Sequence, residues 1–274
     1  MIPFLLAAVL NLGTPPPPEP ANEVAAHLRS ALQDVEHRFI DAKGGHVDYT
    51  ALARSPEYAA VVRIAVSLQQ VHPETLSRTD RLAFWLNTYN ALVIHGIIEQ
   101  GIPTSVQAMP TFFTETAYRI GGQDIHLDAI EAGVLSGNKV STEAPTGVFG
   151  PDDPRRAWVV QPPDPRIHFG LVCGASSCPP IRFYTGERIE SQLSLAAESF
   201  LNGSAVTVDP AHHRLRLSQI FQWYDADFGG KAGIRALLAT YLDKGPAKDH
   251  LMAHWGSYRW EYAPYDWQLN QQTH

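Results

Sequence analysis

Two cysteines, a histidine and two arginines gather in one short stretch, RIHFGLVCGASSCPPIR, which runs from residue 166 to residue 182. Cys173 and Cys178 are the only cysteines of the chain. A cysteine acts as a nucleophile in its thiolate form, which forms when a base such as histidine lies beside it. The stretch therefore suggests a thiol-dependent hydrolase, for amide cleavage or acyl transfer, with Cys178 as nucleophile and His168 as base.

The preference for Cys178 over Cys173 follows from the alternation of side chains along a strand. The largely apolar run 166–173 predicts a buried β-strand that ends in a loop of small residues, 174–177. Residues an odd number apart on a strand face opposite sides, so Cys173 would point away from His168. Cys178 follows the loop and can return to the side of the strand that carries His168. In this hypothesis Cys173 has a supporting role, and the loop amides act as oxyanion donors.

Two further polar residues are candidates to orient the imidazole of His168. Asn90 lies in a strongly apolar helical segment, and Glu131 follows soon after a predicted strand. A catalytic triad needs such a third group to hold its base in the correct tautomer. Asn90 shares a helix face with Asn87, and a structural role, bonding to the backbone, is the alternative for both.

Arg166 and Arg182 bracket the stretch and are the candidates for substrate binding. A guanidinium group can hold a carboxylate through two parallel hydrogen bonds. The alternative is an ion pair inside the protein, with Asp164 or Glu131 as the acidic partner.

Two other outcomes compete with thiol catalysis. Two cysteines in an exported protein commonly pair, and a Cys173–Cys178 disulfide would make the stretch a rigid, non-catalytic binding platform. His168 and the two cysteines, completed by Glu131 or His126, would also suit zinc, although their spacing is not a standard zinc pattern. We expect no resident cofactor and keep zinc as the alternative.

Helical patterns dominate the first half of the chain. Apolar residues recur at helical spacing over 21–41 and 57–71. Ser77 and Asp80 then form the start signal of an apolar helix over 81–100, which we expect to be central to the core.

Strands and turns are concentrated in the second half. Gly121-Gly122 predicts one hairpin, and 209–213 predicts a second between two short strands. The proline-rich excursion 137–165 is typical of a lid or of a plain surface loop. We predict one α+β domain over 22–270, with a helical N-terminal half and a small mixed or antiparallel sheet that carries the His/Cys stretch.

Composition indicates a folded globule, with 45% hydrophobic and 18% charged residues. A net charge of -7 argues against nucleic acid as a partner. Phe4 to Leu10 is similar to the core of a secretory signal, although no positively charged residues precede it, so 1–20 is predicted to be a signal and proline-rich leader. We expect a periplasmic or secreted protein without a transmembrane segment. Substrate, partner and oligomeric state stay open.

Four motifs follow one another along the chain: AFWLNTYNAL at 83–92, LDAIE at 127–131, the stretch 164–182, and LSQIFQWY from 217 through Phe228, with a final YDW at 265–267. In them the sequence resembles the family catalogued as domain of unknown function 547 (DUF547). The resemblance implies a shared fold and shared polar residues, but no activity. Similar proteins carry a histidine and an arginine after the second motif, where this chain has Ala132 and Ser136.

Overall fold

The computed structural model describes residues 10, 13–43, 45–142 and 144–272, and these form two compact units. The first unit comprises the chain up to residue 164, then 171–189 and 267 onward. The second comprises 165–170 and 190–266. Helices and two small sheets occur together, so the predicted α+β class is confirmed.

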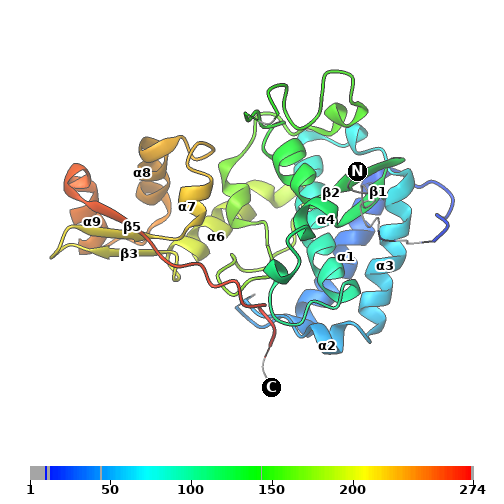
Figure 1. Cartoon of the computed structure of the whole chain (residues 1–274), viewed down its shortest axis with the longest axis horizontal. Helices are drawn as coiled ribbons and strands as arrows, with labels where there is room; N and C mark the ends of the chain where they lie inside the picture. The colour runs from blue at the N-terminus through cyan, green and yellow to red at the C-terminus, as the bar shows by residue number, and fades with distance from the viewer. Residues whose placement is uncertain (1–9, 11–12, 44, 143, 273–274) are drawn as a thin grey trace, which may run out of the picture. The chain divides into compact units, whose positions relative to one another are not determined.

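Three helices form the core of the first unit (Figure 1): α1 (Ala21–Phe39) packs against α3 (Pro56–Ser67) and α4 (Arg78–Glu99). The buried residues of α1 recur at helical spacing along one face: Ala21, Val24, Leu28, Ala31, Leu32, Val35 and Phe39. This spacing is the helical stripe that the sequence predicts. The short helices α2 (Tyr49–Leu52) and α5 (Phe112–Glu115) complete the regular helices of this unit.

Helix α4 is the central element of the first unit. Ser77 caps it, since its hydroxyl oxygen accepts a hydrogen bond from the N–H of Asp80. Every residue from Leu82 to Ile97 is buried, including both asparagines of the first motif. A helix buried on all sides must lie inside the core, as predicted.

The predicted Gly-Gly hairpin is present in the first unit. Strands β1 (Ala117–Ile120) and β2 (Gln123–His126) pair in antiparallel fashion. Gly121 and Gly122 have φ angles of 53° and 76°, which glycine adopts readily and which suit a two-residue hairpin turn. The hairpin leads directly into the π-helix Ala129–Leu135, which carries Glu131.

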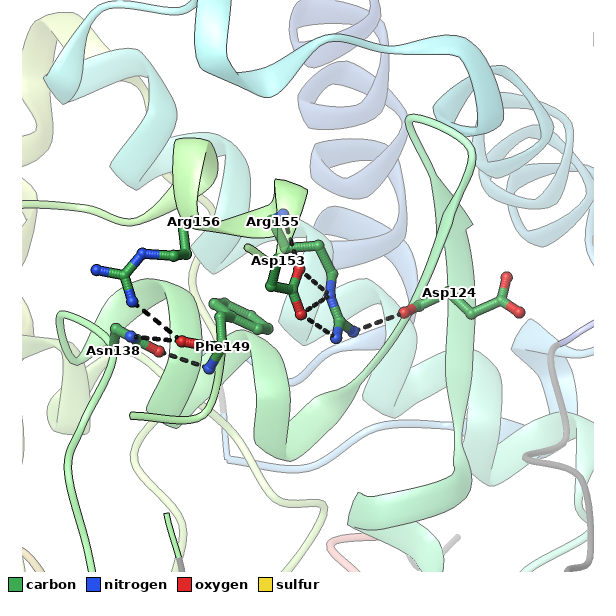
Figure 2. A network of polar contacts seen from close by, with 6 residues as sticks. All are labelled: Asp124, Asn138, Phe149, Asp153, Arg155 and Arg156. Carbon is green, nitrogen blue, oxygen red and sulfur yellow. Dashed lines mark hydrogen bonds and ion pairs between the residues drawn. The ribbon is translucent and has the colours of Figure 1, made fainter. Parts of the chain in front are cut away.

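The excursion 137–165 is anchored by Phe149, whose side chain is fully buried (Figure 2). The Asn138 amide brackets the Phe149 backbone, accepting from its N–H at 2.8 Å and donating to its carbonyl at 3.1 Å. The guanidinium of Arg155 lies 4.8 Å from the centre of the Phe149 ring and bonds to the Asp153 carboxylate and the Asp124 carbonyl. These contacts describe a surface loop that is fixed to the core, rather than a lid.

The second unit contains a three-stranded mixed sheet in the order β3-β4-β5. Strand β3 (Val206–Asp209) pairs antiparallel with β4 (Arg214–Leu217), and β4 pairs parallel with β5 (Arg259–Tyr262). Four helices belong to this part of the chain: α6 (Ile189–Leu201), α7 (Ile220–Trp223), α8 (Gly230–Tyr241) and α9 (Pro246–Ala253). Helix α9 packs against β3 and α8.

The prediction of a strand over 166–173 is wrong. Residues 165–169 form a 3₁₀-helix, and neither sheet carries the His/Cys stretch. Pro165 starts this turn with its fixed φ and has no N–H to give to a sheet. The N–H of Val172 donates to the side chain of Asn90 instead of to a neighbouring strand. A side chain thus takes the place of the strand partner that the apolar pattern suggests.

The predicted signal core, Phe4–Leu10, lies outside the described residues except for Leu10. The N–H of Leu10 donates to the carbonyl of Ala117, and the Gln69 side chain donates to the carbonyl of Gly13. None of the helices in the described part of the chain has the length and apolar character needed to cross a bilayer.

Candidate functional site

Cys173 and Cys178 form a disulfide, with their sulfur atoms 2.10 Å apart. Both thiols are used in this bond, so neither can serve as a nucleophile in this state. Gly174 turns the chain between them with a φ of 77°, and a Cβ at this position would lie 2.5 Å from Cδ1 of Ile97. The loop therefore requires glycine here, for both its conformation and its close approach to α4.

The C-terminal segment of the first unit holds the disulfide loop in place. Ser176 donates to the carbonyl of Gln268 from its N–H at 2.8 Å and from its hydroxyl at 3.1 Å. The N–H of Asn270 donates to the carbonyl of Gly174 at 2.9 Å. The Ser176 amide, one of the four loop amides predicted as oxyanion donors, is thus bonded to the backbone of the C-terminal segment.

Two buried side chains of α4, Asn87 and Asn90, form what we call the asparagine clamp. Asn90 accepts from the N–H of Val172 at 3.2 Å and donates to the carbonyl of Arg182 at 3.3 Å. Asn87 accepts from the N–H of Tyr184 and donates to its carbonyl, both at 2.8 Å. Each amide pairs with backbone through both its nitrogen and its oxygen, so Asn87 holds the segment after the disulfide and Asn90 holds the backbone on both sides of the disulfide loop.

Arg182 lines a cavity of about 610 Å³, which we call the Arg182 cavity. Its wall is made by the C-terminal half of α1, the turn that follows it and the clamped segment: Gln33, Glu36, His37, Ile40, Asp41, Ala42, Lys43, Ile181 and Arg182. Burial raises the pKa of Glu36, and the positive charge of Arg182 opposes part of that rise. The predicted binding arginine therefore faces a cavity together with a carboxyl group that burial makes easier to protonate.

A second cavity, of about 340 Å³, lies along the N-terminal half of α1. It is lined by Asn22, Ala25, Ala26, Arg29, Leu76, Asp80, Ala83, Phe84, Asn87, Tyr184, Thr185, Gly186 and Glu187. Among its charged residues, Asp80 and Glu187 are exposed and Arg29 is half-buried. It lacks the pairing of a partly buried arginine with a partly buried carboxyl.

Glu131 lies in the first unit and contacts Tyr89, whose hydroxyl donates to its carboxylate at 3.2 Å. Partial burial, followed by the negative charge of Glu131, raises the pKa of Asp128 to about 6. Asp128 as a whole residue is exposed, so this shift acts on a carboxyl group that water still reaches. The sequence identifies Glu131 but not its acidic neighbour.

His126 lies before the same π-helix and accepts a hydrogen bond at Nδ1 from the N–H of Ala129. Burial lowers the pKa of His126, so it favours the neutral imidazole. As the side chains stand, no three His, Cys, Asp or Glu in the described ranges form a group that could hold a metal. The zinc alternative built on Cys173 and Cys178 would need both thiols released from their disulfide.

His168 belongs to the second unit, where it is buried and bonded to Asp227. Its Nε2 lies 3.0 Å from Oδ2 of that carboxylate. The ring stacks on Tyr224 with a centroid distance of 3.7 Å and meets Phe228 edge-on. The carboxylate partner of His168 is therefore Asp227, a residue that the sequence reasoning missed although the fourth motif runs through it.

Arg166 also belongs to the second unit and bonds to α6. Its Nη2 lies 2.5 Å from the Glu190 carboxylate, and its Nη1 donates to the Ser194 hydroxyl at 3.0 Å. Arg166 therefore forms an internal ion pair, which is the alternative to substrate binding in the sequence analysis. Its acidic partner is Glu190. Arg182, the other predicted binding arginine, lines a cavity.

A family model described as "Protein of unknown function, DUF547" matches residues 73–201. This range includes α4, the π-helix, the disulfide loop and the cavity residues Ile181 and Arg182, whereas the part of the cavity wall on and after α1 lies outside it. No curated protein and no solved structure matches the chain. The chain therefore contains, over residues 73–201, a domain of the DUF547 family.

Proposed function

We propose that the first unit binds a small molecule bearing a carboxylate in the Arg182 cavity, and that the disulfide is structural. The observation that carries this proposal is the shared cavity of Arg182 and Glu36. Its volume, about 610 Å³, lies within the range of roughly 300–1,000 Å³ typical of small-molecule sites. The guanidinium is the natural partner of a ligand carboxylate, through two parallel hydrogen bonds.

The Cys173–Cys178 disulfide and the asparagine clamp support this role by fixing the wall that carries Arg182. Asn90 holds the backbone on both sides of the disulfide loop. A pre-positioned arginine loses less conformational entropy when a ligand binds. Glu36, when protonated, can donate a hydrogen bond to the same ligand, which selects carboxylates over cations.

The test is a thermal-shift screen of the tag-free, non-reduced protein against small mono-, di- and tricarboxylates and N-acyl amino acids. The matching primary amides serve as neutral controls. We expect at least one carboxylate to raise the melting temperature while its amide does not, and Arg182→Gln to abolish the rise. Arg29→Gln, which alters the second cavity, should respond as the unmodified protein does. A rise that survives Arg182→Gln would place binding elsewhere and contradict the proposal.

A thiol-dependent hydrolase is the second candidate, and the His168–Asp227 pair favours it. A buried histidine held by a carboxylate at 3.0 Å is the arrangement that orients a general base. This function requires a reduced Cys178. Intact-mass analysis of the native protein, with and without an alkylating reagent, separates the two candidates. Binding without thiol chemistry predicts no labelling and a mass two protons light; rapid labelling of one cysteine would favour the hydrolase.

We further propose that the protein is exported. The apolar segment Phe4–Leu10 supports this, as does the disulfide, because disulfides persist mainly in oxidising compartments. Cell fractionation of a host that expresses the full chain tests the proposal. A processed form in the periplasm or medium is expected, and an unprocessed, reduced form confined to the cytoplasm would contradict it.

A further inference from the structure

Three histidines of the second unit form a compact cluster outside the site described above. His213 lies in the turn between β3 and β4, His250 on α9, and His254 directly after α9. Their ring centroids are 4.5 Å apart for His250 and His254, 5.1 Å for His213 and His250, and 5.9 Å for His213 and His254. Two of the three are four residues apart, which brings them to one side of the helix end.

These separations match those of three imidazoles around one metal ion. A zinc–nitrogen bond is about 2.05 Å, which places each ring centroid about 3.2 Å from the metal. Two rings at the tetrahedral angle are then about 5.2 Å apart, and two rings at a right angle about 4.5 Å. The three observed distances lie on both sides of the tetrahedral value.

Two of the rings are also anchored as metal-binding histidines usually are. Nδ1 of His213 lies 2.7 Å from the Ser257 hydroxyl, and Nδ1 of His250 lies 2.8 Å from the Tyr258 hydroxyl. A partner on one nitrogen fixes the ring and leaves the other nitrogen as a metal ligand. In both residues the remaining nitrogen is Nε2.

We propose that His213, His250 and His254 form a binding site for a zinc-type divalent transition metal ion, with water as the fourth ligand. As the side chains stand, no three His, Cys, Asp or Glu in the described part of the chain form a group that could hold a metal ion. Binding therefore involves ring rotation. His254 is the residue that turns, because it is exposed and its ring lies beside the two other imidazoles.

The test is calorimetric titration of tag-free, EDTA-treated full-length protein with Zn²⁺ at pH 7.5. We expect one equivalent to bind in the micromolar range, and His250→Gln and His254→Gln each to weaken binding at least tenfold. His212→Gln is the matched control: His212 is adjacent to His213, but its Nδ1 pairs with Asp209 at 2.8 Å. This variant should bind zinc as the unmodified protein does.

Co²⁺ provides a readout that reports the ligand geometry. We expect the intense visible absorption of tetrahedral Co²⁺ in the unmodified protein and in His212→Gln, and its loss in His254→Gln. Circular dichroism shows whether each variant is folded, and His250→Gln offers a second test should His254→Gln fail to fold. Zinc binding of equal strength in the unmodified protein and both cluster variants, or no binding at all, would overturn the proposal.

Discussion

Asn90 donates a hydrogen bond from its side-chain Nδ2 to the backbone carbonyl of Arg182 over 3.3 Å. Its Oδ1 accepts from the N–H of Val172, so one side chain joins the two segments that flank the disulfide loop. The core helix α4 is thereby tied directly to the wall of the Arg182 cavity. An asparagine that looks available for catalysis in the sequence bonds to the backbone through both its amide nitrogen and its oxygen in the fold.

Replacing Asn90 with alanine should lower the free energy of unfolding by about 1–3 kcal/mol, because the buried N–H of Val172 and carbonyl of Arg182 lose this partner. Urea unfolding measures the loss. Asn22→Ala, at an exposed asparagine of α1, is the control and should change stability by less than about 0.5 kcal/mol. Equal stabilities of the two variants would show that the clamp is not structural.

Carboxylate binding should strengthen as the pH falls through the raised pKa of Glu36. Below that pKa the side chain is neutral, so it no longer repels the ligand and can donate a hydrogen bond to it. The raised pKa of Glu36 also affects stability. Because the pKa of Glu36 is higher in the folded than in the unfolded protein, folding takes up a proton between these two pKa values. The free energy of unfolding therefore rises as the pH falls from the folded-state pKa to the unfolded-state pKa. Glu36→Gln should remove both effects. The measurement is the carboxylate affinity and the free energy of unfolding as functions of pH, for the unmodified protein and for Glu36→Gln. The same pH dependence in both proteins would refute this role of Glu36.

His95 should make the protein sensitive to acid. Burial lowers the pKa of this histidine to about 4, and the nearby Glu99 only partly opposes the shift. Because the unfolded-state pKa is higher, the unfolded chain takes up the proton first, and stability falls as the pH drops from about 6.5 towards 4. The loss is roughly 3 kcal/mol for a group buried to this degree. The free energy of unfolding, measured at several pH values in this range, should fall more steeply with acid in the unmodified protein than in His95→Gln. The same pH dependence in both proteins would contradict this role of His95.

Phe149→Ala should destabilise the first unit by about 3–5 kcal/mol, since it removes a fully buried ring. The ring also packs on the π-helix: a Cβ added at Gly133 would lie 2.5 Å from its Cζ. We expect proteases to cut 137–165 much faster in this variant. Val140→Ala is the control, because Val140 is 64% exposed. Unchanged cleavage of Phe149→Ala would mean that Phe149 does not anchor the excursion.

Local signals predict the elements that local interactions determine. The Ser77 cap and the apolar run of α4 predict that helix to within a few residues, and Gly121-Gly122 predicts the first hairpin. The stretch 166–173 has the apolar pattern of a buried strand, but this pattern does not show which group pairs with its backbone. The partner of Val172 is a side chain far away in the sequence.

The candidate site is harder to predict for the same reason. Arg182 can be singled out from its chemistry, but its cavity is completed by Glu36 on α1, which no local pattern connects with it. Asp227 is likewise distant in sequence from His168. The spacing of the two cysteines permits both a disulfide and a free nucleophile, and only the folded loop, closed by a bond between the sulfurs, distinguishes them.

The most direct measurement is calorimetric titration of the tightest carboxylate from the screen into the non-reduced protein and its Arg182→Gln variant. Arg29→Gln serves as the control. We expect the dissociation constant to rise at least tenfold in Arg182→Gln and to stay unchanged in Arg29→Gln, since one charge-assisted pair is worth about 1.5–3 kcal/mol. Equal dissociation constants for all three proteins would contradict a carboxylate site at Arg182.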